Sequence, residues 1–413
     1  MSAIEGFYKK SLEERIKTVK EISKLDDKDV ENLKKTGALD LLTAEKMIEN
    51  VIGTFQLPMS IAVNFLINEK DYLIPMVLEE PSVVAAASNA AKLCRPEGFK
   101  TESTEPIMIG QIQIFAEDLQ KAEEKIRENK KKIFDFVNSK DSSVIKLGGG
   151  LKDIEYKKIE AEKKMLIVNL LIDVRDSMGA NFVNTICEEV SPLLEQITGG
   201  ESRLRILSNL CDRRIAKATA IWKKEVVGDD VVEGILDAYL FAKNDVYRST
   251  THNKGIMNGI DAVCLATGND FRALEAGAHS YASIGGYKPL TKYWKNKNGD
   301  LVGEIEIPLA VGIVGGSTKT NPIVGIALKI LGIKTAKELA EIMAAVGLAN
   351  NFAALRALST EGIQRGHMKL HAKNVAVAAG AKGETIEKIA QQMIKEKKIS
   401  ETRAREILKK LEE

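Results

Sequence analysis

The stretch Ile107–Phe115, IMIGQIQIF, alternates apolar and polar side chains along most of its length and therefore predicts a β-strand. Residues 118–140 are strongly charged and predict one long helix. A triple-glycine turn, Gly148–Gly150, follows, and residues 154–174 are long enough for two strands. Residues 177–210 then predict a helix and a final strand. The order β-α-β-β-α-β is the ferredoxin-like split motif.

The chain on either side of this motif is mostly helical. We therefore expect residues 105–210 to form a dinucleotide-binding domain inserted into a larger, discontinuous domain of residues 1–104 and 211–360. Residues 361–413 are charged and helical, and we expect them to form a small mobile flap. The predicted fold class is α+β, with a mixed large domain of helices around a small sheet, an inserted ferredoxin-like domain and a helical C-terminal flap.

Local signals place elements of the larger domain. Ser11 and Thr335 each stand three residues before a glutamate, which is the capping box that begins a helix. Another N-terminal helix is expected from Thr43 to Gly53. Two strands joined by a turn are predicted between residues 60 and 78, and an alanine-rich helix is predicted over 83–93.

Composition limits the class of protein. With 413 residues, 44% hydrophobic and 29% charged, the chain is typical of a globular protein with two or three domains. A net charge of +2 and few aromatic residues argue against a nucleic-acid surface, and no stretch has the length of a membrane span. Four scattered cysteines fit a reducing compartment, and the N-terminus lacks a signal-peptide core. We expect a cytoplasmic protein with no nucleic-acid or membrane partner.

One stretch concentrates reactive side chains, Arg248–Asp270, with the sequence RSTTHNKGIMNGIDAVCLATGND. We expect Lys254 to lie in a Thr-His-Asn-Lys-Gly loop and Asp270 to lie in a turn that opens a helix. A lysine and a carboxylate that meet at one site shift each other's pKa. The plainer interpretation is a solvated lysine and a helix-capping aspartate. Upstream, Glu80 stands before Pro81, either as a helix-entry charge or as a carboxylate at a cleft.

Sequence motifs for metals and phosphates do not fit. The glycine clusters at 148 and 315 match neither the dinucleotide fingerprint nor the P-loop. His367 and His371 lie four residues apart without a glutamate between them, so we predict no metal site. One lysine, two carboxylates and one histidine remain as candidates. That set suits reduction of a carbonyl, because the ammonium stabilises an oxyanion, a carboxyl delivers a proton and the histidine protonates a leaving group.

These residues lie in stretches that resemble a known family, the class II (soluble prokaryotic) 3-hydroxy-3-methylglutaryl-coenzyme A (HMG-CoA) reductases. The matches run in order over nearly the whole chain. They are ENVIGTFQLP (49–58), EEPSVVAAAS (79–88), DVRDSMGAN (173–181), LRILSNL (204–210), THNKGIMNGID (251–261), ATGND (266–270), GGSTKTNP (315–322) and EGIQRGHMKLH (361–371). The resemblance implies a two-step hydride reduction of (S)-HMG-CoA to (R)-mevalonate and coenzyme A, or the reverse, with NADH or NADPH as the reductant.

The resemblance also implies roles for single residues. The implied catalytic residues are Glu80, Lys254, Asp270 and His367, the last as the acid that protonates the coenzyme A thiolate. The implied substrate contacts are Ser82, Asn209, Arg248 and Asn258, with Glu49 and Asn50 on the coenzyme A side. The implied cofactor contacts are Asp141, Asp176, Met178, Gly179 and Asn181.

Cofactor choice rests on Asp141. An aspartate that faces the adenosine ribose accepts hydrogen bonds from a 2′-hydroxyl and repels a 2′-phosphate, which favours NADH. A surface aspartate in a turn is the alternative, and the neighbouring Lys140 suits a phosphate. A basic N-terminal position that some relatives use for coenzyme A is Tyr8 in this chain, with Lys9 and Lys10 beside it.

The resemblance further implies a homodimer with the active site at the subunit interface, or a hexamer built as a trimer of dimers. We expect Glu80 to reach the lysine across a subunit boundary. Two other functions stay open, reduction of a different acyl thioester and non-catalytic binding on the same fold. A panel of thioesters separates the first from HMG-CoA reduction. The second requires loss of one of the four catalytic residues, and all four are present.

Overall fold

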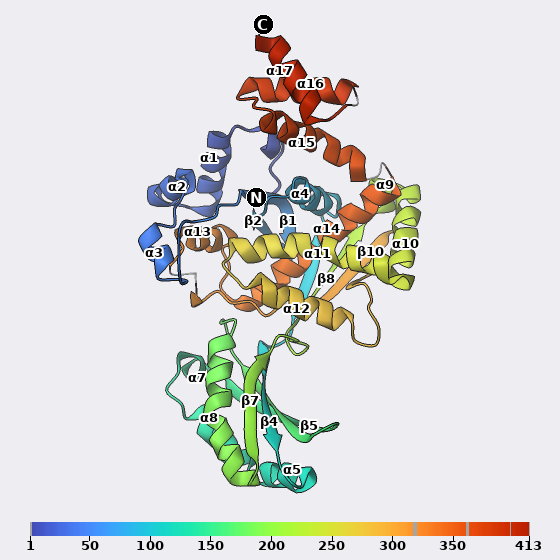
Figure 1. Cartoon of the computed structure of the whole chain (residues 1–413). Helices are drawn as coiled ribbons and strands as arrows, with labels where there is room; N and C mark the ends of the chain where they lie inside the picture. Colours follow the sequence, from blue (N-terminus) through green and yellow to red (C-terminus); the bar gives the residue numbers. More distant parts are fainter. Residues whose placement is uncertain (1, 317–319, 361–362, 397, 413) are drawn as a thin grey trace.

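The computed structural model describes residues 2–316, 320–360, 363–396 and 398–412, with backbone alone for 363–370 and 412. Its elements form three groups arranged one after another (Figure 1). A six-stranded sheet with its helices lies in the middle, a four-stranded sheet with its helices lies at one end, and the C-terminal helices lie at the other end. The predicted α+β fold class is confirmed.

The larger sheet has the strand order β2-β1-β3-β8-β10-β9. Its strands are β1 (Met59–Ile67), β2 (Lys70–Val77), β3 (Phe99–Ser103), β8 (Ile215–Trp222), β9 (Thr291–Lys295) and β10 (Leu301–Pro308). β1 and β2 form the predicted hairpin, with Asn68 and Glu69 at positive φ in its turn. β3 and β8 pair antiparallel. The chain therefore leaves the larger sheet and returns to it on adjacent strands.

The helices of the central group bury its core. They are α4 (Val83–Leu93), α9 (Lys224–Val227), α10 (Asp229–Asn244), α11 (Val246–Ala266), α12 (Phe271–Ala282), α13 (Pro322–Leu331) and α14 (Ala336–Ser359). Gly259 and Gly347 allow α11 and α14 to pack closely, because a Cβ at Gly259 would lie 2.1 Å from Nδ2 of Asn350 and one at Gly347 would lie 2.9 Å from Cδ1 of Ile260. By length and composition α14 could cross a membrane, but 67% of its most apolar window is buried, as in a core helix.

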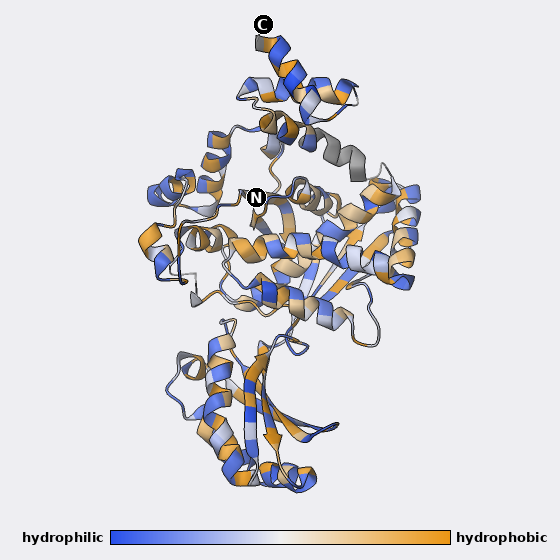
Figure 2. Cartoon of the chain, in the orientation of Figure 1, coloured by the Kyte–Doolittle hydropathy of each residue, from blue (hydrophilic) through white to orange (hydrophobic). Residues whose placement is uncertain are grey.

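The smaller sheet has the strand order β5-β6-β4-β7, and all of its pairs are antiparallel. Its elements are β4 (Ile107–Phe115), α5 (Leu119–Glu128), α6 (Lys130–Asn138), α7 (Ser143–Lys146), β5 (Gly150–Glu160), β6 (Lys164–Asp173), α8 (Ala180–Thr198) and β7 (Glu201–Ser208). This topology is the predicted ferredoxin-like one. Hydrophobic residues concentrate on β4 (Figure 2), whose side chains pack in a core separate from that of the larger sheet.

Two predicted helices differ in the structure. The single helix expected over 118–140 is two, α5 and α6, which meet at Asn129, and the Asn129 side chain donates a hydrogen bond to the Lys125 carbonyl. The helix expected from Thr43 to Gly53 is the short α3 (Leu41–Glu45), capped by Asp40. Residues 46–53 form turns and irregular backbone with exposed apolar side chains, and not the expected helix. That prediction was wrong.

The remaining elements agree with their end signals. The N-terminal ones are a 3-10 turn η1 (Phe7–Lys9), α1 (Leu12–Ser23) and α2 (Asp27–Lys34), and the capping box at Ser11 is present. The capping box at Thr335 likewise begins α14. The C-terminal helices α15 (Ile363–Ala378), α16 (Glu384–Glu396) and α17 (Glu401–Glu412) share a small core of their own.

Candidate active site

Lys254 lies on a helix, in contrast to the predicted loop. The 21-residue α11 is capped by Asp245, whose side chain accepts a hydrogen bond from the Arg248 N–H at 2.7 Å. Buried neighbours of Lys254 hold the helix in place, because the Asn253 amide bonds the Lys288 carbonyl and the Leu290 N–H. Tertiary contacts therefore outweigh the weak helix propensity of the Thr-His-Asn sequence.

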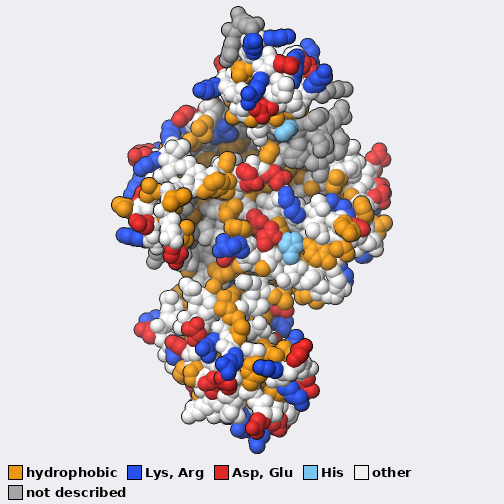
Figure 3. Space-filling view, viewed as in Figure 1, with side chains coloured by type: hydrophobic (Ala, Val, Ile, Leu, Met, Phe, Trp, Pro, Cys, Tyr) orange, Lys and Arg blue, Asp and Glu red, His pale blue; other side chains and the backbone are white. Residues whose placement is uncertain are grey.

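The ammonium of Lys254 meets the carboxylate of Glu80. Their Nζ and Oε2 atoms are 3.1 Å apart, although 174 residues separate them in sequence. Glu80 follows β2 and precedes α4, so one sheet end and two helices position the pair. The Lys254 side chain is 59% exposed and that of Glu80 is 37% exposed, which leaves both open to a substrate. Acidic and basic side chains lie close together over the region of α11 and α12 (Figure 1 and Figure 3).

This pair forms within one chain, whereas we expected Glu80 to reach the lysine across a subunit boundary. Strand β2 packs against α11, and Glu80, three residues after the end of β2, reaches the lysine from there. A partner subunit is therefore not required to join these two residues.

Ser82 stands at the start of α4 in a strained backbone conformation. Its φ is +78°, and its side chain makes no capping hydrogen bond. Left-handed backbone is uncommon outside glycine and costs about 1 kcal/mol or more, and it concentrates at functional sites. The hydroxyl is thus placed near Glu80 without serving the helix that it begins.

Asp270 caps α12, as the sequence predicted. Its carboxylate accepts hydrogen bonds from the Arg272 and Ala273 N–H groups at 3.0 and 3.3 Å and forms an ion pair with the Arg272 guanidinium at 3.0 Å. Among the described residues, no hydrogen bond or ion pair joins this carboxylate to Lys254. Glu80, and not Asp270, is the carboxylate bonded to the lysine.

Two candidate substrate contacts lie on α11 with Lys254. Asn258 is four residues on and shares its face, since side chains four apart lie one above the other. Arg248 is six residues back and lies on a different face. Burial lowers the pKa of Arg248, and its Nε is buried without a hydrogen-bond partner among the described residues. Such a guanidinium edge can receive a carboxylate ligand.

A second carboxylate cluster lies along the same helix face and was not foreseen. Asp261 is seven residues after Lys254, and burial, then the hydrogen bond and charge of Glu275, raise the pKa of Asp261 to about 8. Glu275 contacts His279 at 2.8 Å, and the other His279 ring nitrogen bonds the Tyr287 hydroxyl at 2.6 Å. The i,i+7 spacing after Lys254 was the available sequence signal.

His252 also lies on α11, but its side chain is buried. It is 1% exposed, and its Nε2 lies 2.6 Å from the Thr291 hydroxyl. Burial, and then the charge of Arg248, lower the pKa of His252 to about 3. A histidine that stays neutral at physiological pH packs this core and does not serve as the acid.

The candidate cofactor segment, residues 174–181, follows β6 of the smaller sheet and contacts residues of the central group. Gly179 precedes α8 at φ +99°, where a Cβ would lie 2.6 Å from Cγ1 of Val174. The Asp176 carboxylate accepts the Ala336 N–H at 2.8 Å, at the start of α14. The Met178 carbonyl accepts a hydrogen bond from the Arg214 guanidinium at 3.2 Å. Asn181 is exposed in the first turn of α8.

Asp141 lies elsewhere on the same domain and is already paired. Its carboxylate lies 2.5 Å from Nζ of Lys146 and is 86% exposed. Lys140 is bonded to Glu189 at 3.0 Å. Both charges are therefore partly neutralised before any ligand arrives.

The remaining candidates are less constrained. Asn209 is exposed just after β7, and Glu49 and Asn50 are exposed in the segment after α3. Asn50 has φ +58°. The His367 side chain lies outside the described residues.

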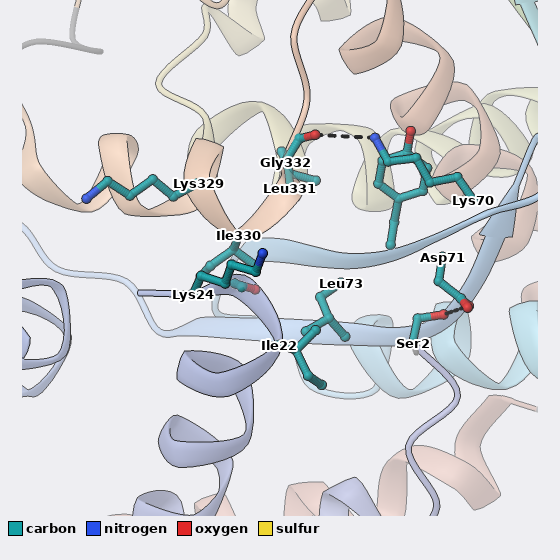
Figure 4. A pocket seen from close by; sticks show the side chains of 12 residues that line it. Ser2, Ile22, Lys24, Lys70, Asp71, Leu73, Lys329, Ile330, Leu331 and Gly332 are labelled. Atoms are coloured by element: carbon teal, nitrogen blue, oxygen red, sulfur yellow. Dashed lines mark hydrogen bonds between the residues drawn. The ribbon is translucent and has the colours of Figure 1, made fainter. Parts of the chain in front are cut away.

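Within the described part of the chain, no three His, Cys, Asp or Glu side chains are grouped to hold a metal ion. A hollow of about 230 Å³ lies between the end of α1, the start of β2 and the end of α13, lined by Lys24, Lys70 and Lys329 among others (Figure 4). Glu80 follows the opposite end of β2, so this hollow is separate from the Lys254–Glu80 pair.

Comparison with known proteins agrees with this geometry. A sequence profile described as hydroxymethylglutaryl-coenzyme A reductase matches residues 11–372. A protein of Archaeoglobus fulgidus named 3-hydroxy-3-methylglutaryl-coenzyme A reductase is 56% identical over 414 residues, which cover 99% of this chain and 95% of that protein. A protein of Borreliella burgdorferi named as a probable enzyme of the same kind is 39% identical and covers 80% of this chain and 77% of that protein.

Solved structures agree as well. The 3-hydroxy-3-methylglutaryl-coenzyme A reductase from Streptococcus pneumoniae superposes with a TM-score of 0.84 at 39% identity, over 98% of this chain and 99% of that one. A structure of the class II enzyme from that organism, bound to NADPH in open conformations, has a TM-score of 0.82 at 38% identity, over 98% of this chain and 100% of that one. The chain therefore belongs to the hydroxymethylglutaryl-coenzyme A reductase family.

Proposed function

We propose that this chain reduces (S)-HMG-CoA to (R)-mevalonate and coenzyme A in two hydride steps, or runs the reverse oxidation. The observation that carries the proposal is the 3.1 Å contact between Lys254 and Glu80 at an exposed surface. An ammonium and a carboxyl that share a hydrogen bond can stabilise an oxyanion and then protonate it. When bound, a reduced nicotinamide supplies one hydride to the carbonyl carbon in each step.

In the first step Lys254 donates a hydrogen bond to the thioester oxygen. Negative charge develops on that oxygen as the carbonyl carbon becomes tetrahedral, and the fixed ammonium stabilises it. The product at this stage is the oxyanion of a hemithioacetal. We assign Asp270, held by the start of α12, to orienting the lysine, as the resemblance implies.

The hemithioacetal then loses its thiolate. The C–S bond breaks, the carbonyl of mevaldehyde forms and a proton must reach sulfur. We assign the delivery of that proton to His367, as the resemblance to the family implies. A histidine suits this role because it exchanges protons near neutral pH.

In the second step the aldehyde oxygen becomes the alcohol of mevalonate. Lys254 again holds the oxygen, and Glu80, bonded to Lys254, delivers the proton. The lysine thus serves both hydride steps and Glu80 completes the second.

The other substrate contacts are those that the resemblance implies, and their side chains suit the groups of the substrate. The guanidinium of the partly buried Arg248, whose Nε has no hydrogen-bond partner among the described residues, suits the free carboxylate of the acyl group. The hydroxyl of Ser82, whose backbone is strained, and the Asn209 amide are further donors. Asn258 lies beside the substrate oxygen on the face of Lys254. We place the coenzyme A moiety along the segment of Glu49 and Asn50 and near the exposed Tyr8.

The residues near Gly179 fit a dinucleotide. The N-terminus of the 19-residue α8 is an anion site by its dipole and free N–H groups. Arg175 stands beside it, and its guanidinium bonds the Gly148 carbonyl at 2.9 Å. The Arg175 Nε is buried without a hydrogen-bond partner among the described residues and lies 3.7 Å from the Asp173 carboxylate. Asp176, Met178 and Asn181 would complete this side of the cofactor.

The choice between NADH and NADPH depends on Asp141. The sequence alone favours NADH. Because Lys146 neutralises this carboxylate, its repulsion of a 2′-phosphate is reduced. We propose that the enzyme accepts both cofactors.

We also propose a homodimer that covers the active site, which can assemble further as a trimer of dimers. The segment after α3 carries apolar side chains that are almost fully exposed, with Ile52 at 103% and Phe55 at 90%. Residues of this kind in a contiguous segment mark an interaction surface. A dimer mass in light scattering that falls to the monomer mass in Ile52→Asp/Phe55→Asp, but not in Val226→Asp, supports this. A monomeric parent protein contradicts it.

The functional division follows the two sheets. We propose residues 1–104 and 211–360 for substrate and dimerisation, 105–210 for the dinucleotide, and 361–413 as the flap that carries His367. The separate cores support this division. Four buried free cysteines suit a cytoplasmic location.

A panel of thioesters tests the proposed substrate. Purified protein is mixed with a reduced nicotinamide and, in turn, HMG-CoA, acetyl-CoA and succinyl-CoA, and cofactor oxidation is followed. Oxidation with HMG-CoA alone supports the proposal. Faster turnover of another thioester would transfer the assignment to that substrate, and no turnover with any of them would favour a binding protein.

A further inference from the structure

The loop Asp176–Met178 is held by residues outside the four-stranded sheet. Arg214, in the connection from β7 to β8, is 5% exposed. Its guanidinium donates to the carbonyls of Ser177 and Met178, each at 3.2 Å, and to that of Val311. Burial lowers the pKa of Arg214 to about 10, so the group remains charged at neutral pH. A buried guanidinium bonded to three main-chain carbonyls fixes backbone, since it offers several donors in one plane.

The Val311 carbonyl belongs to the irregular segment after β10, which packs against the same loop. A Cβ at Gly312 would lie 2.4 Å from the Met178 nitrogen, so only glycine permits this approach. The next residue, Ile313, donates its N–H to the Asp176 carbonyl at 2.9 Å. The loop and this segment therefore form one packed unit.

Asn269 joins that unit to the catalytic end of α12. Its Oδ1 accepts the Gly312 N–H at 2.8 Å and its Nδ2 donates to the Gly312 carbonyl at 3.1 Å. The same Nδ2 also bonds the Thr267 hydroxyl at 3.1 Å. Asn269 immediately precedes Asp270, the cap of α12. Asp270 is thus connected to the loop through its chain neighbour Asn269, the hydrogen bonds of Asn269 with Gly312, and the hydrogen bond from the Ile313 N–H to the Asp176 carbonyl.

We propose that Asn269 and Arg214 are positioning residues that hold the cofactor loop Asp176–Met178 in register with the end of α12 that carries Asp270. The inference rests on the proposed function, because it concerns the distance between the bound nicotinamide and the substrate carbonyl. Reaction requires the two carbons within about 3–3.5 Å, and a displacement of about 1 Å can slow it about a hundredfold. The four-stranded sheet has its own core, so its loop needs such ties to keep that distance.

The test compares Asn269→Ala and Arg214→Lys with a matched control, Asn296→Ala. The Asn296 side chain accepts two main-chain N–H groups, both at 2.9 Å, in the turn between β9 and β10, so its loss removes similar bonds away from the loop. Four quantities are measured for each protein: kcat, KM for HMG-CoA, the dissociation constant of NADPH from its fluorescence, and hydrogen exchange of the peptide covering residues 174–181.

We expect Asn269→Ala and Arg214→Lys to lower kcat about tenfold or more, with KM for HMG-CoA within about twofold of the parent. The NADPH dissociation constant rises and the 174–181 peptide exchanges several times faster. Asn296→Ala behaves as the parent in all four. Unchanged NADPH affinity and unchanged exchange in both variants overturn the proposal, whatever happens to kcat.

Two further outcomes are decisive. Should Asn269→Ala not fold, Asn269→Asp keeps the acceptor for the Gly312 N–H and loses only the donor, and it is judged with Arg214→Lys by the same criteria. A parent protein that binds NADPH but does not reduce HMG-CoA removes the proposed function, while the affinity and exchange criteria still decide the positioning role.

Discussion

Nζ of Lys254, on α11, lies 3.1 Å from Oε2 of Glu80, in the loop between β2 and α4, although the two residues are 174 apart in sequence. Both groups are exposed, so the contact is poorly explained as a stabilising ion pair, since exposed pairs contribute about 0–1 kcal/mol. In the proposed mechanism its value is chemical, because it places the Glu80 carboxyl group beside the ammonium that would bind the carbonyl oxygen.

The first prediction concerns this pair. Lys254→Ala is expected to lower kcat about 10²- to 10³-fold, because the oxyanion loses its fixed cation. Glu80→Gln is expected to lower it by about 10²-fold or more. If the two act as one unit, the double variant loses little more than the worse single variant. Steady-state rates and circular dichroism check this.

The matched control is Lys217→Ala. Lys217 pairs with Glu306 at 2.8 Å on the adjacent strands β8 and β10, away from Lys254. Parental turnover in Lys217→Ala is expected. Retained turnover in a folded Lys254→Ala would remove the lysine from the mechanism.

The second prediction separates the two chemical steps. His367→Gln is expected to slow reduction of the thioester about 10²-fold or more and to leave reduction of free mevaldehyde within a few-fold, because only the first releases a thiolate. His371→Gln, an exposed histidine on the same helix α15, is the control. Equal losses with both substrates would contradict the leaving-group role.

The third prediction concerns pH and stability. The pKa of Asp261 is raised from 3.8 to about 8, chiefly by burial and then by Glu275. Between those two values the folded protein binds the proton and the unfolded chain does not, so the free energy of unfolding falls as pH rises from about 4 to 8. Asp261→Asn is expected to flatten this slope in urea melts.

The control for this slope is Asp237→Asn, an exposed aspartate on α10. It is expected to keep the parental pH dependence. Parallel curves for Asp261→Asn and the parent would mean that Asp261 is ionised in the folded protein at neutral pH.

The fourth prediction concerns cofactor choice. Lys146→Ala frees the Asp141 carboxylate and is expected to raise the preference for NADH over NADPH about two- to fivefold in kcat/KM, since a solvated charge acts weakly. Asp141→Asn is expected to shift it the other way. Lys131→Ala, which breaks the exposed pair with Asp135 on α6, is the control. An unchanged ratio in both test variants would show that Asp141 does not face the ribose.

Much of the fold follows from local pattern. Alternation in β4 and the capping boxes at Ser11 and Thr335 depend only on neighbouring residues, and the structure contains all of them. The ferredoxin-like order also followed from the sequence of elements alone. Such signals are local because side-chain period and capping geometry are set within a few residues.

The helix that carries Lys254 could not be predicted from the local sequence pattern. Its sequence contains Thr251, Asn253 and Gly255, which disfavour helix, and the stabilising contacts come from Lys288, Leu290 and α14. These partners are distant in sequence, so no local pattern predicts them. The contacts of Lys254 with Glu80 and of Asn269 with Gly312 could not be predicted for the same reason.

The most direct test of the central claim is the stoichiometry of a complete reaction. A limiting amount of HMG-CoA is reduced to completion with excess NADPH, and in parallel with excess NADH, while cofactor oxidation, free thiol and mevalonate are measured. The account predicts two cofactor molecules oxidised and one thiol released for each mevalonate formed. One cofactor oxidised per thiol, with an aldehyde as the final product, or no oxidation with either cofactor, would contradict it.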